Sequence, residues 1–520
     1  MEMRMEGGGQ IESRGLSSGS WGMEGESVRK WQILLVILVF AVAAFLLFFR
    51  LGAGSLHSWT EAIYAEISKE ILATGDWNTL HHNGRVYLKK PPLFMWLTAL
   101  AYQALGISEF SARLASPLFA LGIFLLVYLF ARRIGPWPVG LGAILLLLHG
   151  VKDWQYAHRF NFLALCRVGN LEIPLTFFIA WAMYLCWRGR ERPRCLLWMG
   201  IPLGLGIMTK SAVGLLPFLM ALLFVFFTRK RIVWSWRHLA AGLGLGLLIA
   251  APWHLGQLLL HGRHFWDDYV SVTLFSRVSH YLTRTKGETY YLAILRKGFG
   301  LSVYLLPLAL PYALYQGARR RDDASLLLLL WALLPLLLFS LSRDKNGWYI
   351  AQIYPAMALL LSRFLWGASK RPWAFGLVIA LLFASGLRFP PPADPARDIK
   401  ALAPCIQAWV KPGEILYEYG VGFGTPAPNL TFYADRFTRS LRKRPLAEAL
   451  ETEGRFLATT TDYWHQDEQG GRLICQSGRW VLLKAEGRGT GKASHAQEVE
   501  AGKAPAPSEG EEDETSSEAE

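Results

Sequence analysis

About eleven apolar runs, spread from residue 32 to residue 388, restrict the possible folds of this chain more than any other feature of its sequence. A helix needs about 20 mainly apolar residues to cross a lipid bilayer. The first run, residues 32–49, follows Arg29 and Lys30 and lacks a small-residue cleavage site, so it is predicted to be an uncleaved anchor. The composition, 52% hydrophobic and 18% charged, also differs from that of soluble domains. The chain is therefore predicted to be an all-α multi-pass membrane protein of roughly eleven to thirteen transmembrane helices. Further spans are expected near residues 112–131, 136–150, 171–187, 195–208, 211–228, 238–255, 298–316, 324–341, 347–365 and 373–388.

Basic residues are clustered in short connections between these runs. If the N-terminus is cytoplasmic and each run crosses the membrane, every cluster falls on the cytoplasmic side, as the positive-inside rule requires. This pattern accounts for the formal net charge of +14, so nucleic acid is not expected as a partner. The clusters are Arg132-Arg133, Arg188/Arg190/Arg192/Arg194, Arg229-Lys230-Arg231, Arg319-Arg320-Arg321 and Lys370-Arg371.

The same topology leaves long segments on the outer side: residues 51–111, 151–170 and 256–297, and everything after Phe389. Ordinary connections are short, and long loops rich in aromatic and charged residues usually carry function. The functional site is therefore expected on the outer side. The chain is predicted to comprise a disordered cytoplasmic tail (1–30), a transmembrane domain (31–389), a small outer α/β domain (390–486) and a disordered acidic tail (487–520).

Within the predicted outer domain, four segments have the composition of short strands: residues 413–420, 430–437, 455–464 and 479–487. Cys405 and Cys475 are the only cysteines of this domain. A disulfide between them is predicted because an outer compartment permits oxidation, but two separately buried thiols fit the spacing almost as well.

Glycine patterns in the spans do not indicate nucleotide binding. Gly204 to Lys210 resembles a phosphate-binding loop but lacks the glycine before the lysine, and no strand precedes it. Gly242, Gly244 and Gly246 lie within a predicted span, where small residues favour close helix packing.

The first predicted outer loop carries the most specific motifs. It contains Trp59-Thr-Glu-Ala-Ile-Tyr-Ala-Glu-Ile, then Gly75-Asp-Trp, then Lys89-Lys-Pro-Pro-Leu. In this order the motifs resemble the first outer loop of GT-C glycosyltransferases of the aminoarabinose-transferase and protein O-mannosyltransferase type. The resemblance covers roughly residues 31–485 and continues through Ala112-Arg113-Leu114, Arg167 to Phe178, Met208-Thr-Lys210, Ala251-Pro-Trp253, and Phe339 to Lys345 with Tyr349.

This resemblance implies a GT-C fold in the cell (inner) membrane, with the active site and the C-terminal domain extracytoplasmic. It also implies transfer of a hexosyl or pentosyl group from a polyprenyl-phosphate donor to a lipid, glycan or protein acceptor. Membrane lipids would be further partners. No nucleotide would be needed, and a divalent metal is left open.

Four cations are predicted to bind the donor phosphate, because negative charge grows on the leaving phosphate as the glycosidic bond breaks. A single lysine at a helix end is more often a snorkelling side chain than a ligand. Several cations on the same side favour a binding site instead. The four are Lys90, Lys210, Arg277 and Lys345.

A carboxylate is needed to take the proton of an attacking acceptor hydroxyl. Glu61 is the first candidate and Glu172 the second, the latter paired with Arg167 or Arg159 because an unpaired acid at the entry of an apolar helix is unfavourable. Supporting roles are predicted for Tyr64, Glu66 and Tyr349.

The sequence departs from the family pattern at three acidic positions. Thr60 stands where the family usually has Asp, Lys89 where an acid often precedes Lys-Pro-Pro, and Glu172 where Asp is more usual. Glu61 or Glu66 then takes the acid role, or the mechanism is changed, or the protein binds a lipid-linked glycan without turnover. A transporter or flippase of polyprenyl lipids is a further alternative, although the two related halves that such a protein would have are not found.

Overall fold

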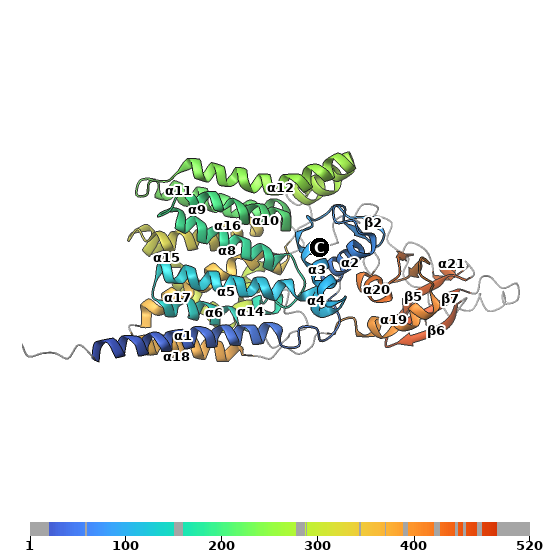
Figure 1. The fold of residues 1–520 in the computed structure, drawn as a ribbon. Helices are drawn as coiled ribbons and strands as arrows, with labels where there is room; N and C mark the ends of the chain where they lie inside the picture. Colours follow the sequence, from blue (N-terminus) through green and yellow to red (C-terminus); the bar gives the residue numbers. More distant parts are fainter. Residues whose placement is uncertain are drawn as a thin grey trace, which may run out of the picture.

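The computed structural model shows a long helical bundle with a small sheet-containing domain at one end (Figure 1). It describes residues 20–57, 60–149, 160–276, 287, 289–342, 345–369, 371–387, 394–420, 427–441, 446–450, 454–464 and 471–485. Arg159, Arg277, residues 1–19 and the predicted acidic tail therefore lie outside the described residues.

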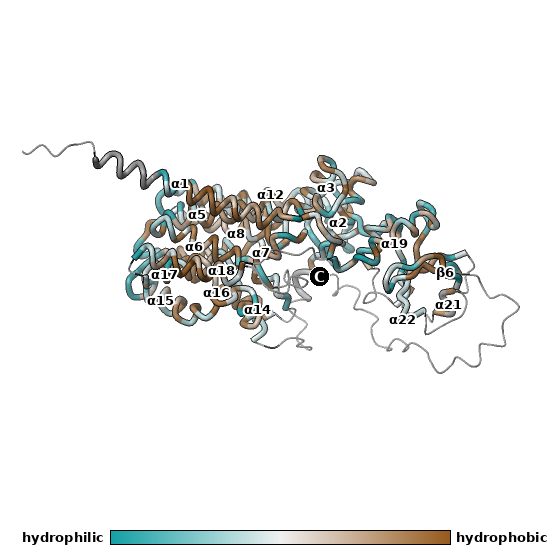
Figure 2. The backbone as a smooth tube through the Cα atoms, turned by 90° about the horizontal axis from the view of Figure 1, so that it is seen from below, coloured by the Kyte–Doolittle hydropathy of each residue, from teal (hydrophilic) through white to brown (hydrophobic). Residues whose placement is uncertain are grey.

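Each predicted span contains a helix, so the multi-pass prediction is confirmed. By length and composition, six segments of the described chain can cross a membrane: Lys30–Phe48, Glu109–Ile134, Arg194–Thr228, Trp236–Ser271, Tyr290–Ala318 and Asp323–Leu341. Hydrophobic residues follow the length of the bundle in Figure 2. The bundle helices are α1 (Ser20–Phe48), α5 (Ala115–Ile134), α6 (Trp137–Leu147), α8 (Glu172–Gly189), α9 (Arg194–Trp198), α10 (Gly200–Lys210), α11 (Leu216–Thr228), α12 (Trp236–Phe265), α15 (Leu306–Ala318), α16 (Asp323–Leu341), α17 (Tyr354–Ser369) and α18 (Pro372–Gly386).

Helix α1 begins earlier than predicted. Residues 1–30 were expected to lack structure, but the helix already starts at Ser20. The apolar span nucleates a helix, and the Met, Glu, Arg and Lys residues that precede it extend this helix readily.

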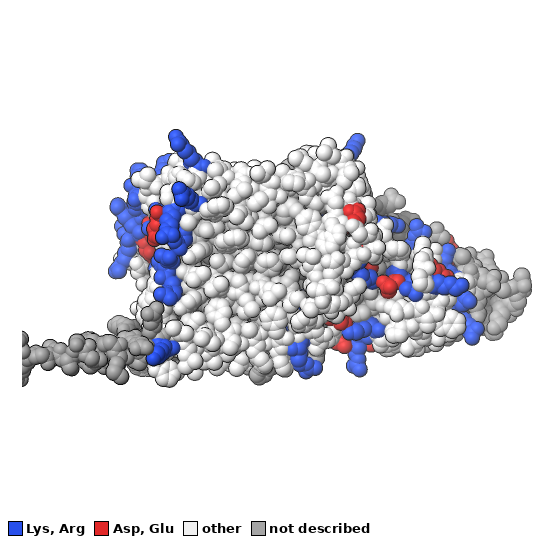
Figure 3. All heavy atoms as spheres, viewed as in Figure 1, with Lys and Arg blue, Asp and Glu red and all other residues white. Residues whose placement is uncertain are grey.

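One end of the bundle is basic, and the small domain lies at the other. Figure 3 shows Lys and Arg side chains gathered at the end remote from the domain. Asp322 and Asp323, at the start of α16, pair there with Arg363 (2.9 Å), Arg190 (3.2 Å) and Arg231 (3.1 Å). This distribution agrees with the predicted topology, in which the basic clusters share one side. The two ends are called the basic end and the domain end below.

Irregular turns shape the domain end. The chain reverses between α10 and α11 through the 3-10 helix η2 (Ser211–Leu215). Its first residue, Ser211, has φ 53°. A Cβ on Gly214 would lie 2.2 Å from the Ile207 nitrogen, so only glycine permits this close approach. Elements of this end also include η3 (Trp266–Ser276, a π-helix), η4 (Gly300–Leu305), η5 (Gly347–Ile353), α7 (Phe162–Leu165) and α14 (Tyr290–Phe299).

The first loop folds into a compact unit between the bundle and the small domain (Figure 1). The family resemblance predicts amphipathic helices in this loop, and the structure has three helices here, α2, α3 and α4. Helix α2 packs on α3 through an apolar cluster that includes Ile63, Ile67, Phe94 and Met95. The elements are α2 (Thr60–Thr74), β1 (His81–His82), β2 (Arg85–Val86), α3 (Leu93–Leu105) and α4 (Glu109–Arg113).

The small domain is α/β, as predicted. Its mixed sheet has the order β4-β3-β5-β7-β6, with parallel β4/β3 and β3/β5 pairs and antiparallel β5/β7 and β7/β6 pairs. The predicted disulfide joins Cys405 to Cys475. The elements are α19 (Arg397–Trp409), β3 (Leu416–Glu418), α20 (Pro428–Ala434), β4 (Thr438–Ser440), α21 (Leu446–Leu450), β5 (Phe456–Thr460), α22 (Thr461–Trp464), β6 (Gly471–Ser477) and β7 (Trp480–Ala485).

One strand prediction in this domain was wrong. Residues 430–437 were expected to form a strand, but most of them belong to helix α20. Pro428 in the first turn fixes a helical φ, and Asp435 ends the helix in a left-handed conformation. Burial of Leu430, Phe432 and Ala434 outweighs the strand propensity of the segment.

Candidate active site

Glu61 is buried at the start of α2 in a closed network. Arg113, at the end of α4, donates from Nε to Oε1 (2.8 Å) and from Nη2 to Oε2 (3.3 Å). The backbone N–H groups of His57 and Gly169 donate to the same carboxylate over 2.6 and 3.0 Å. Glu61 therefore ties together the start of the first loop, α4 and the turn before α8.

These contacts favour the ionised form of Glu61. Burial alone would raise the pKa of its carboxyl group, but the charges of Arg113 and His57 and the hydrogen bonds lower this pKa to about 2. A carboxylate with so low a pKa is a weak base. The structure thus gives Glu61 a fixed position more clearly than a proton-accepting role.

Glu172 and Lys210 form the second buried pair, at the domain end of α8 and α10. Lys210 Nζ lies 2.7 Å from Glu172 Oε1, and both side chains are about one-tenth exposed. The ammonium also lies 4.4 Å from the centre of the Tyr349 ring in η5. The predicted cation, carboxylate and supporting tyrosine thus meet in one place.

Lys210 is held at a strained turn. It ends α10, and Ser211 then adopts φ 53° and ψ −138°, a conformation that a residue with a side chain rarely takes. Such strain persists only where surrounding packing imposes it, and it is common at functional sites.

Lys90 and Lys345 are buried at the same end of the bundle, each 2% exposed. Lys90 lies two residues after Leu88, which packs against Ile207 and Met208 near the end of α10. Lys345 lies two residues before η5, which carries Tyr349. The structure therefore brings three of the four predicted phosphate ligands to one region, and the fourth, Arg277, lies outside the described residues.

The pairing predicted for Glu172 was wrong with respect to Arg167. The guanidinium of Arg167 instead donates to the carbonyl oxygens of Leu46 (2.6 Å), Leu47 (2.7 Å) and Phe49 (2.7 Å). These carbonyls at the end of α1 have no partner within the helix, so they attract a cation.

The remaining supporting residues lie on α2. Tyr64 is buried and packs edge-on against Phe94 at 6.0 Å. Glu66 is buried, and its Oε2 lies 3.1 Å from Lys69 Nζ. Burial raises the pKa of Glu66 to about 7 in spite of Lys69. Both side chains therefore face the interior of the first loop.

The half-buried Lys89 lies close to His82 in the β1–β2 hairpin. Burial, together with the charge of Lys89, lowers the pKa of His82 to about 4, so its imidazole is neutral at physiological pH. No group of three or more His, Cys, Asp or Glu side chains in the described ranges is placed to hold a metal ion.

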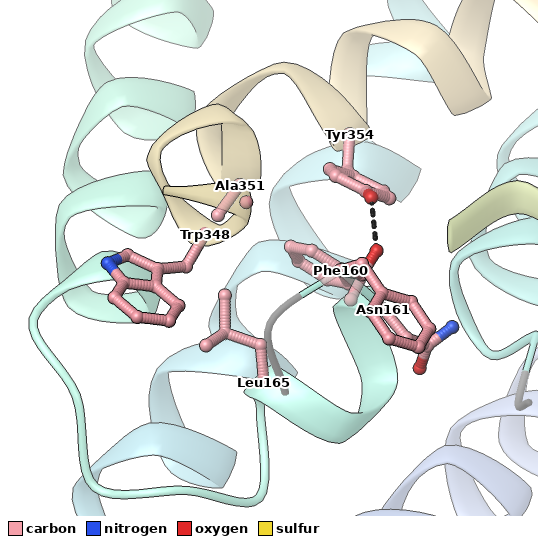
Figure 4. Close-up of a pocket in the computed structure, with 8 residues that line it drawn as sticks. Phe160, Asn161, Leu165, Trp348, Ala351 and Tyr354 are labelled. Carbon is pink, nitrogen blue, oxygen red and sulfur yellow. Dashed lines mark hydrogen bonds between the residues drawn. The ribbon is translucent and has the colours of Figure 1, made fainter. Parts of the chain in front are cut away.

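A small crevice lies beside η5, with an internal volume of only about 10 Å³ (Figure 4). Leu165, Trp348, Ala351 and Tyr354 are among its mainly apolar walls. The Tyr354 hydroxyl donates to the carbonyl oxygen of Phe160 over 2.6 Å. The crevice thus adjoins the helix that presents Tyr349 to Lys210.

Arg113 is the main residue that sequence reasoning left without a role. It lies in the Ala-Arg-Leu motif, and a basic residue at the entry of an apolar helix is itself a sign that an acid is buried nearby. Which acid it pairs with depends on the path of the 51 residues between Glu61 and Arg113.

The described chain has the multi-pass helical architecture of the GT-C fold. Solved structures share this fold: ArnT of Cupriavidus metallidurans bound to undecaprenyl phosphate aligns with a TM-score of 0.71 at 21% identity, covering 86% of this chain and 97% of that one. The Archaeoglobus fulgidus oligosaccharyltransferase aligns with a TM-score of 0.58 at 12% identity, covering 85% and 73%.

Sequence comparison shows which proteins the chain is similar to. Residues 89–255 match the model of the dolichyl-phosphate-mannose-protein mannosyltransferase family. An undecaprenyl phosphate-α-4-amino-4-deoxy-L-arabinose arabinosyl transferase of Pseudomonas fluorescens is 31% identical over 65% of this chain and 60% of its own length. An uncharacterised protein of Aquifex aeolicus is 28% identical over 63% of each. The chain thus aligns with about three fifths of the length of these relatives, and they are similar to it in the way that its motifs predict.

Proposed function

We propose that this protein transfers a sugar from a polyprenyl-phosphate donor to a lipid, glycan or protein acceptor at the domain end of the bundle. The observation that supports this proposal most strongly is that Lys90, Lys210 and Lys345 are all buried at that end. Relatives named for undecaprenyl-phosphate sugars support this donor class, and whether the sugar is a hexose or a pentose belongs to the same proposal. The domain end would face away from the cytoplasm, since the basic residues gather at the other end.

In the proposed step, an acceptor hydroxyl oxygen attacks the anomeric carbon and the bond from that carbon to the phosphate oxygen breaks. The polyprenyl phosphate leaves with an additional negative charge, which the lysine ammonium groups stabilise. The acceptor proton passes to a carboxylate.

Glu172 fits the proton-accepting role better than Glu61. The Glu61 carboxylate accepts four hydrogen bonds, whereas the described part of the chain offers Glu172 a single one, from Lys210. We therefore assign proton acceptance to Glu172 and the positioning of surrounding segments to Glu61. Lys210 would pair with Glu172 before the step and then move toward the growing charge on the phosphate.

Turnover and donor binding in purified variants test these assignments. Lys90→Ala or Lys345→Ala should lower turnover roughly a hundredfold or more, the usual loss when such a group is removed. Lys89→Ala is the matched control on the adjacent residue and should have a smaller effect. Equal losses at Lys89 and Lys90 would mean that the region is merely a basic surface.

The carboxylates are tested in the same assay. Glu172→Gln should abolish transfer while the donor still binds, because only proton acceptance is lost. Full turnover in both Glu172→Gln and Glu61→Gln would eliminate the carboxylate mechanism. Donor binding with no transfer by the wild-type protein would instead support the alternative of a lipid-glycan binding protein.

A further inference from the structure

Helix α2 and the segments on either side of it contact the C-terminal domain at three places. The first contact precedes the helix: Asn429 Nδ2 donates to the carbonyl oxygen of Leu56 (2.8 Å), and the N–H of Leu56 donates to the Tyr433 hydroxyl (2.8 Å). Ser55 is held in the same way, because its N–H donates to Asp394 (3.0 Å) and its hydroxyl accepts from the N–H of Ala396 (2.7 Å).

This first contact leads directly to Glu61. Arg113 Nη2 donates to the carbonyl oxygen of Ser55 over 2.7 Å, and Arg113 also holds the Glu61 carboxylate. The Tyr433 hydroxyl donates in turn to Glu109, on the same short helix as Arg113. The C-terminal domain thus contacts the backbone against which the Glu61–Arg113 pair is built.

The second contact lies at the middle of α2 and uses a single lysine. Lys69 Nζ lies 3.1 Å from Glu66 Oε2, 2.9 Å from Asp435 Oδ1 and 3.1 Å from the carbonyl oxygen of Phe432. The ammonium group thus forms ion pairs with two carboxylates and donates a hydrogen bond to one carbonyl oxygen. Because Phe432 and Asp435 lie at the end of α20, Lys69 also caps that helix, where a cation is favourable.

The third contact lies beyond α2, at the tip of the β1–β2 hairpin. Asn83 donates from Nδ2 to the carbonyl oxygen of Thr438 (2.7 Å) and accepts from its N–H (2.8 Å). Glu70, near the end of α2, accepts from the N–H of Gly84 (3.1 Å) and that of Asn83. The end of the helix is thereby joined through the hairpin to strand β4.

We propose that the C-terminal domain is a positioning element of the transfer site, and that Lys69 is the positioning residue through which α20 sets the place of α2. This inference rests on the proposed function. The domain holds the helix that carries Glu61, and the Glu61 carboxylate accepts from the N–H of Gly169, three residues before Glu172. Lys210 and Lys345, two of the proposed phosphate ligands, belong to the bundle. Loosening α2 should therefore slow the transfer step more than it weakens binding of the donor phosphate.

The test compares Lys69→Met with Lys69→Arg in the full-length protein. Lys69→Met keeps the aliphatic stem but has no donor, and it should lower kcat at least tenfold while the donor KM stays within about twofold. Lys69→Arg keeps the charge and the donors and should restore most of kcat. Asp435→Asn should have part of the effect of Lys69→Met and add little to it, because both act on one contact.

A readout besides activity separates this inference from the proposed function. Amide exchange across residues 60–74 should be faster in Lys69→Met than in the wild type and unchanged in Lys411→Met, an exposed lysine on the same domain. A wild-type protein without transferase activity would overturn the proposed function, yet α2 exchange would still test the contact. Unchanged exchange in Lys69→Met, or faster exchange with normal kcat, would overturn the positioning role.

Discussion

At the scale of single residues, the Glu61–Arg113 pair shows how the free-energy cost of burying a charge is offset. Burial of a carboxylate is strongly unfavourable unless hydrogen bonds and an opposite charge replace its water. Glu61 has both, since a guanidinium and two backbone N–H groups contact it. Loss of Arg113 would leave this carboxylate buried without its counter-ion.

The lowered pKa of Glu61 predicts a pH-dependent stability. The pKa is about 2 in the folded protein against 4.5 for the free side chain, so the contribution is complete above pH 4.5 and is lost as the pH falls toward 2. This shift corresponds to about 3 kcal/mol. Thermal unfolding in detergent between pH 5 and pH 3 should therefore show a steep loss of stability that Glu61→Gln reduces.

The matched control for that measurement is Glu191→Gln, an exposed glutamate at the basic end. This variant should keep the wild-type pH dependence. The same slope in Glu61→Gln and in the wild type would contradict the assigned pKa.

At the scale of elements, α12 shows that neighbouring glycines serve different purposes. A Cβ on Gly242 would lie 2.2 Å from the carbonyl oxygen of Leu196, so α9 and α12 approach closely there. A Cβ on Gly244 would meet nothing within 4 Å. The predicted packing role therefore holds for Gly242 and not for Gly244.

Alanine at these two positions should have effects of opposite sign. Gly242→Ala forces α9 and α12 apart and should lower stability by about 1–3 kcal/mol. Gly244→Ala gains helix propensity and should raise it by up to about 1 kcal/mol. Melting temperatures of both variants in one detergent provide the measurement, and equal shifts would refute the packing argument.

The limits of sequence reasoning also lie at this scale. Span positions and basic clusters follow from composition and spacing. The Cys405–Cys475 disulfide was one of two outcomes that spacing and compartment left open, and the fold of the small domain decides it. Helix α20 was missed because Leu430 and Phe432 suit a strand, and only their burial against other elements decides the outcome. The Lys210–Glu172 pair was missed for a related reason, since 38 residues separate the partners and loop paths determine which charges meet.

At the scale of the whole molecule, the separation of the basic end from the domain end predicts the orientation in the membrane. A cysteine introduced at the exposed position Arg479 should react with an impermeant reagent in intact cells. One introduced at the exposed position Lys230, at the basic end, should react only after the membrane is opened. The reverse pattern would contradict both the topology and the proposed side of transfer.

The native cysteines should contribute little background to this labelling. Cys166 and Cys186 are buried, and Cys405 and Cys475 are joined, so Cys195→Ser removes the remaining partly accessible thiol. Labelling of that parent should be negligible on both sides.

The contacts between the first loop and the C-terminal domain also impose an order on biosynthesis. Tyr433 lies 377 residues after its partner Leu56, and Thr438 lies 355 residues after Asn83. At roughly 5–20 residues per second, a ribosome needs roughly 20–75 s to make the second partner after the first. During that interval the nascent first loop lacks its contacts with the C-terminal domain. A prematurely terminated chain would contain every residue of the proposed site and still leave α2 unsecured, so the last segment to be made decides whether the first becomes competent.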